Sequence, residues 1–159
     1  HLERMRGLAD SPGALGRDHF VPAHFTASSF VLSPDESALL LIFHGKLHRW
    51  LQPGGHVEPE DVDIVAAARR EVAEEVGLGD LLLVGDGLPF DLDIHAIPAR
   101  KADPEHEHFD VRFLFRAPSW QVKADSDAVD ARWVPLDEVS GLESDASVLR
   151  ALGKLRARD

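Results

Sequence analysis

Cysteine and tyrosine are both absent from this chain of 159 residues. Without cysteine there is no disulfide, no thiolate nucleophile, no iron–sulfur cluster and no zinc site built on cysteine. Long apolar runs are absent too, since the longest, residues 38–43, is far shorter than the roughly 20 residues that cross a bilayer. No signal peptide is evident at the N-terminus. We therefore expect a soluble protein in the cytoplasm.

Basic residues are scarce relative to acidic ones. Seventeen Lys and Arg stand against 28 Asp and Glu, which gives a formal net charge of −11. A surface of this sign repels nucleic-acid phosphates and anionic lipids, so we expect no duplex nucleic acid and no membrane partner. A small anionic substrate is still compatible if a metal ion or a local basic group offsets the charge.

The hydrophobic pattern predicts a mixed α/β fold. With 44% apolar residues, the chain has enough material for one domain with its own core. We expect an N-terminal helical extension over residues 1–16 and a single domain over residues 17–159. Apolar steps of three and four residues predict helices at 62–76 and 144–156. Strands are expected at residues 24–32, 38–44, 81–84, 90–97, 108–117 and 131–134.

Acidic residues gather before and within the helix expected at 62–76. Glu71, Glu74 and Glu75 are spaced i, i+3 and i+4, so they share one face of that helix. Like charges so placed oppose helix formation by a few tenths of a kcal/mol per pair. The cluster is either a solvated helix surface, on which Arg70 pairs with Glu74, or a binding site for a hard cation such as Mg²⁺.

Two glycines precede this acidic segment. Gly54 and Gly55 allow positive φ angles and a close approach of the backbone to a ligand. A Gly-Gly bend that leads into an acidic loop and an acid-faced helix is a plausible cradle for a metal ion and a pyrophosphate.

Residues 55–58 (Gly-His-Val-Glu) and 70–78 (Arg-Glu-Val-Ala-Glu-Glu-Val-Gly-Leu) together resemble the Nudix box. The second segment matches the family pattern at every position. The first departs from it, because Asp61 stands where the pattern has glutamate and one extra residue precedes Arg70. The resemblance implies a Nudix-type α/β/α sandwich with a mixed β-sheet, in which the box forms a loop–helix–loop.

The same resemblance implies a function. Nudix proteins mostly hydrolyse a phosphoanhydride in a nucleoside diphosphate linked to another group, so we expect a pyrophosphohydrolase with a small, nucleotide-derived substrate. Mg²⁺ or Mn²⁺ would be the cofactor. The sequence is also compatible with a homodimer. The implied metal ligands are Glu71, Glu74, Glu75 and the Gly55 carbonyl, and the implied catalytic residues are Arg70, which orients a glutamate, and Glu74 or Glu75, which handles the attacking water.

Two other functions are open to a Nudix fold. A non-catalytic module that senses a nucleotide or a sugar nucleotide would tolerate a degraded box, but all three helix glutamates are present here. Isomerisation of an isoprenyl diphosphate usually relies on a catalytic cysteine, which this chain lacks. The sequence therefore favours the hydrolase, without specifying its substrate.

A second polar cluster is expected on a β-hairpin. Asp93 and His95 alternate along one expected strand, and His108 and Asp110 along the next. If His95 pairs with His108, then Asp93 pairs with Asp110, and all four side chains share one surface. They are interpreted either as substrate or metal contacts or as an ordinary polar or structural face.

Further residues near the box are candidate substrate contacts. Arg49 could bind phosphate and Trp50 could stack on a base, although Trp50 is equally compatible with a place in the core. His56 and Glu58 follow the glycines and could hold or orient a ligand. His24 is interpreted as structural.

Overall fold

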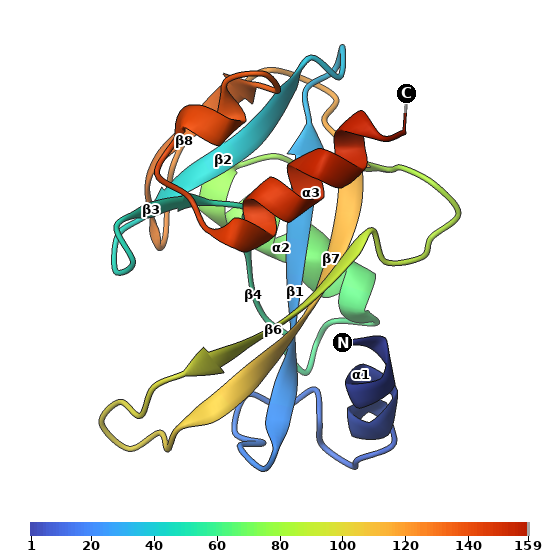
Figure 1. Cartoon of the computed structure of the whole chain (residues 1–159), viewed down its shortest axis with the longest axis vertical. Coiled ribbons are helices and arrows are strands. Elements are labelled where there is room, and N and C mark those ends of the chain that lie inside the picture. Colours follow the sequence, from blue (N-terminus) through green and yellow to red (C-terminus); the bar gives the residue numbers. More distant parts are fainter. Residues whose placement is uncertain (159) are drawn as a thin grey trace.

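The computed structural model describes residues 1–158 (Figure 1). Its helices are α1 (Leu2–Ala9), α2 (Ile64–Val76), α3 (Ala146–Arg156) and a short 3₁₀ helix, η1 (Val139–Gly141). Its strands are β1 (Ala23–Leu32), β2 (Ala38–His44), β3 (Arg49–Leu51), β4 (Gly54–His56), β5 (Leu82–Leu83), β6 (Asp91–Ile97), β7 (His106–Arg116) and β8 (Ala128–Pro135). Among the helices described, none combines the length and the apolar character that a bilayer span requires. The expected mixed α/β fold is confirmed.

Strand β1 is the centre of the sheet. Along one edge it pairs in parallel with β7, from Ala23 opposite Glu107 to Leu32 opposite Arg116. Along its other edge it pairs antiparallel with β4 near its start and with β2 at its end. Strands β3 and β8 then pair with β2, and β5 and β6 pair with β7, all antiparallel. The sheet is therefore mixed, as expected.

Side chains alternate across β1 and β7, so each face of the sheet has its own core. On one face, Ala27 and Val31 pack with Val72 of α2, and Met5 and Leu8 of α1 join the same cluster. Figure 1 shows α3 in front of β1 and β7 and α2 behind them. The face toward α3 has a separate apolar cluster, which includes Phe30, Leu114 and Leu152. This arrangement confirms the expected sandwich.

The box helix begins two residues later than the hydrophobic pattern predicts. Asp63 is extended and caps α2, because its side chain accepts a hydrogen bond from the Ala66 amide at 2.7 Å. Val62, which the sequence placed in the helix, is 89% exposed. At the other end, Gly77 has a left-handed φ of 71° and terminates the helix, as expected.

A buried network of charges joins β6 to β7. Arg112 is 2% exposed, and its Nε lies 2.6 Å from an Asp110 carboxylate oxygen. The same guanidinium reaches Asp93 at 3.2 Å and Asp91 at 3.5 Å. Hydrogen bonding from His95, together with the charges of Arg112 and Arg150, holds the pKa of Asp93 well below its usual range. The lowered pKa of Asp93 keeps that carboxylate charged inside the fold.

Replacing Arg112 with methionine tests this network. Arg112→Met leaves the aspartates buried without their shared cation, so we expect the free energy of unfolding to fall by about 3–5 kcal/mol at pH 7. The matched control is Arg116→Met on the same strand, where the ion pair with Glu36 is solvent-exposed. That control should lose no more than about 1 kcal/mol in a urea melt.

The network also predicts a pH dependence. A carboxyl group whose pKa is lowered by folding stabilises the protein above its unfolded pKa, near 3.9, and this contribution disappears as the pH falls through the folded pKa. The difference in stability between the wild type and Arg112→Met should therefore narrow below about pH 4. A difference that stays constant from pH 7 to pH 3 would contradict the assignment.

Candidate functional site

Strand β4 brings the box glycines against helix α2. A Cβ atom on Gly55 would lie 2.5 Å from a carboxylate oxygen of Glu71, and one on Gly54 would collide with the Ser28 side chain. The Gly54 amide donates to a Glu75 carboxylate oxygen at 3.0 Å. The glycine backbone therefore approaches side chains of the helix and of β1 closely, whereas the expectation concerned an approach to a ligand. The predicted positive φ angles at these glycines are absent, because both residues belong to a short extended strand.

Two box carboxylates are withdrawn from water. Burial raises the pKa of Glu75 to about 8, and burial also raises the pKa of Glu71. Glu74 is different, because its side chain is about half exposed. Carboxylate oxygens are the donors that Mg²⁺ prefers, and a cation would compensate the buried charges. Glu71 and Glu75 therefore have the donor chemistry that suits the cation implied by the family resemblance.

Arg70 connects the loop, the strand and the helix of the box. Its guanidinium donates to Glu71 at 3.0 Å, to Glu74 at 3.2 Å and to the His56 carbonyl at 2.8 Å. It also forms two hydrogen bonds with Asp61, at 3.1 and 3.0 Å, which lower the pKa of that carboxyl group. Arg70 thus has the contacts that orient a glutamate.

Asp61 is the residue at which the sequence departs from the box pattern, and its contacts explain how the longer loop is accommodated. Besides pairing with Arg70, its carboxylate accepts a hydrogen bond from the Glu58 amide at 2.8 Å. Asp61, whose side chain is shorter than the glutamate of the pattern, therefore bridges the loop and the helix. Sequence reasoning left this position without a role.

A pocket of about 780 Å³ lies beside the box. Its walls come from the loop before β1, the start of β1, strand β4, the box loop and the β6–β7 hairpin. The predicted contacts His56, Glu58 and His108 line it, and so does Arg17. Arg49 and Trp50 do not. Arg49 is exposed on β3, and Trp50 is 9% exposed within the α3-side core, which favours the packing alternative for Trp50.

The predicted hairpin register is confirmed. His95 lies opposite His108, and Asp93 lies opposite Asp110. The four residues nevertheless divide into two environments. Asp93 and Asp110 belong to the buried Arg112 network and do not line the pocket, which favours their structural alternative. His108 does line the pocket, and His95 is hydrogen-bonded to Asp93 at 3.1 Å.

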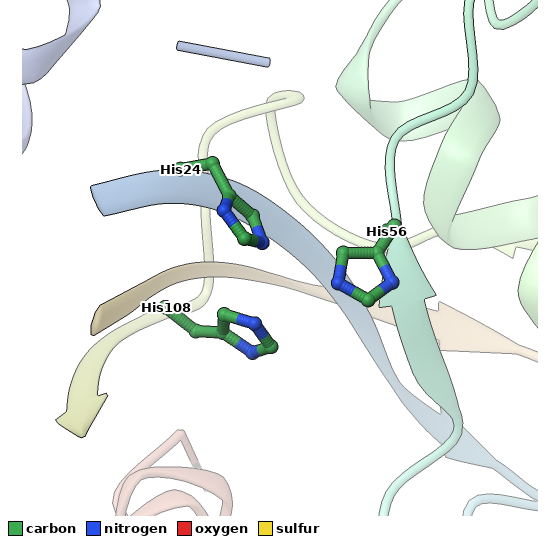
Figure 2. Close-up of side chains that lie close together, drawn as sticks. All are labelled: His24, His56 and His108. Atoms are coloured by element: carbon green, nitrogen blue, oxygen red, sulfur yellow. The ribbon is translucent and has the colours of Figure 1, made fainter. Parts of the chain in front are cut away.

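Three histidines converge at one end of the pocket (Figure 2). One ligand atom from each of His24, His56 and His108 lies within 4.8 Å of the others. Over residues 1–158, no second group of three or more metal-ligating side chains comes this close, and the box glutamates do not form one. Burial lowers the pKa of His56 to about 4 and that of His108 to about 2, so both rings are neutral at pH 7.

Comparison with known proteins now identifies the family. The model of the NUDIX domain matches residues 22–152, and the chain therefore belongs to the Nudix family. A comparison with curated protein sequences found no match.

Several solved structures share the fold. A Nudix-family hydrolase from Clostridium perfringens has a TM-score of 0.67 and 21% identity over 86% of this chain and 98% of its own. The dihydroneopterin triphosphate pyrophosphohydrolase of E. coli has a TM-score of 0.68 and 18% identity over 85% of this chain and 96% of its own. The NUDIX domain of Shewanella oneidensis NrtR, solved with ADP ribose, has a TM-score of 0.63 and 16% identity over 97% of both chains.

The contact between Gly55 and Glu71 yields a prediction. Gly55→Ala places a methyl group where the Glu71 carboxylate lies, so that carboxylate must move away from β4. We expect at least a tenfold rise in the Mg²⁺ concentration that half-saturates thermal stabilisation, because a displaced ligand no longer meets the others around one ion.

The matched control is Gly79→Ala, since a Cβ at Gly79 meets no atom within 4 Å. Its Mg²⁺ response should match that of the wild type in the same thermal-shift titration. An unchanged Mg²⁺ midpoint in Gly55→Ala would show that Glu71 does not bind the ion.

Proposed function

We propose that this protein is a metal-dependent pyrophosphohydrolase that cleaves a phosphoanhydride in a nucleoside diphosphate derivative. The proposal rests on one arrangement: the half-buried carboxylate of Glu71 and the buried carboxylate of Glu75 lie against the backbone of β4, and burial raises the pKa of both. A folded protein retains such desolvated acids at a cost, and they are a common feature of functional sites.

The box residues have different roles in the proposed reaction. Glu71, Glu74, Glu75 and the Gly55 carbonyl would hold Mg²⁺ or Mn²⁺, which when bound neutralises phosphoryl oxygens and lowers the pKa of a coordinated water. Arg70 holds Glu71 and Glu74 in place through its hydrogen bonds. Glu74 or Glu75 then accepts the proton of the attacking water.

The pocket is the proposed substrate site. His56 and Glu58 line it and come from the box strand and loop, so a bound substrate would lie next to the box. Arg17 supplies a cation for a phosphate group, whereas Asp18 and Asp103 make the walls acidic. A phosphorylated substrate therefore needs bound metal ions to offset the negative charge.

A sensing module is the second candidate. The NrtR domain that shares this fold was solved with ADP ribose, and a C. elegans relative is an Ap4A hydrolase. Both ligands are nucleotides that contain phosphoanhydrides, so binding alone does not distinguish a sensor from an enzyme. Hydrolysis of the bound nucleotide does distinguish them.

The test is a substrate panel with a matched pair of variants. Nucleoside triphosphates, sugar nucleotides, dinucleotide polyphosphates and coenzyme A are incubated with Mg²⁺ or Mn²⁺, and the phosphorus-containing products are measured. Glu75→Gln should retain the fold but reduce turnover at least a hundredfold, because a ligand to the catalytic metal is lost. Glu138→Gln changes an exposed residue outside the box and should keep full turnover.

Two results would contradict the proposed hydrolase function. One is full activity in Glu75→Gln or after exhaustive chelation. The other is binding of a panel compound without any turnover, which would favour the sensor instead.

A further inference from the structure

The three histidines of the pocket are brought together by strand pairing. Parallel pairing places His24 of β1 beside His108 of β7, and antiparallel pairing places His56 of β4 beside Thr26 of β1. The ring centroids of the three histidines are 4.7–5.2 Å apart. Because all three positions lie within paired strands, the backbone sets the Cα positions of the three histidines before any ligand binds.

His24 presents an unpartnered nitrogen to this cluster. Its Nδ1 lies 3.2 Å from the His19 carbonyl, and since a carbonyl oxygen only accepts, Nδ1 carries the proton. The lone pair is therefore on Nε2, which is buried and has no hydrogen-bond partner in residues 1–158. The residue is 1% exposed. A second nitrogen held by a backbone carbonyl is the usual support of a metal-binding imidazole.

The spacing suits a tetrahedral ion. With Zn–N bonds of about 2.0–2.1 Å, neighbouring nitrogen ligands are about 3.4 Å apart. The three ligand atoms all lie within 4.8 Å of one another, so their separations exceed the tetrahedral value by at most about 1.4 Å. Figure 2 shows the three rings turned toward a common space between β1, β4 and β7.

We propose that His24, His56 and His108 bind a divalent transition-metal ion of the Zn²⁺ type, with a fourth coordination position that opens into the pocket. Three protein ligands with one open position is the pattern of sites that take up a water or a ligand oxygen. All three histidines line the pocket, so the fourth position is accessible to whatever occupies it.

This site is separate from the carboxylate site of the box. Successive residues of a strand point to opposite faces, so the Gly55 position faces Glu71 whereas His56 faces the other two histidines. The donors also differ, because imidazole nitrogen suits Zn²⁺ and carboxylate oxygen suits Mg²⁺. The two sites thus share no ligand, and the proposed histidine site does not depend on hydrolase activity.

The experiment is a Zn²⁺ titration of the metal-free, full-length protein by calorimetry, with Mg²⁺ in large excess to occupy oxygen ligands. We expect one Zn²⁺ per chain, and at least hundredfold weaker binding in His56→Gln and in His108→Gln. His48→Gln, at an exposed turn position, is the matched control and should bind as the wild type does. Co²⁺ in place of Zn²⁺ should give the intense visible absorption of a tetrahedral site, and both histidine variants should lose it.

The Zn²⁺ titrations test the histidine site independently of the proposed hydrolase function. Glu75→Gln should bind Zn²⁺ with unchanged stoichiometry even though it loses Mg²⁺-dependent turnover. Wild-type Zn²⁺ affinity in a folded His108→Gln variant, verified by circular dichroism, would overturn the proposal. Zn²⁺ binding that excess Mg²⁺ abolishes, or that Glu75→Gln removes, would also overturn it, because the ion would then lie at the carboxylates.

Discussion

The parallel pairing of β1 with β7 is the constraint on which the rest of the structure depends. It joins segments that are more than eighty residues apart in the chain, and it places His24 beside His108 and Ser28 beside Arg112. The same two strands divide the interior into the α2-side and α3-side cores. Because β4 then pairs with the remaining edge of β1, the box is attached directly to this central pair.

Buried charge is treated in two ways in this protein. Within the β6–β7 network, Arg112 pairs with Asp93 and Asp110, and the hydrogen bond from His95 and the nearby guanidinium charges hold the pKa of Asp93 low. At the box, Glu75 is buried against the Gly54 amide and Glu71 is half-buried beside Arg70, and burial raises the pKa of each. The first arrangement is that of a scaffold, whereas the second leaves charge for a ligand to neutralise. The aspartates of the network and the glutamates of the box thus differ in what surrounds each carboxyl group.

Local periodicity predicted several elements well. Helix α2 and its end at Gly77 follow from three- and four-residue apolar steps and from the left-handed conformation that glycine adopts easily. The β6–β7 register follows from alternation, because slipping by one residue would turn the apolar side chains of a strand outward. Strands β3 and β4, with three residues each, are too short to show any period, and they were missed.

The sequence alone determined the family and the acidic face of the box helix, because both lie in contiguous residues whose spacing sets their geometry. Only the tertiary structure decided which side chains share an environment. Trp50 lies in the α3-side core, and Asp61 pairs with Arg70. His24, which the sequence analysis interpreted as structural, lies close to His56 and His108. The histidine cluster depends on pairing between distant strands, which forms through burial of the whole sheet and leaves no signal in any short stretch of sequence.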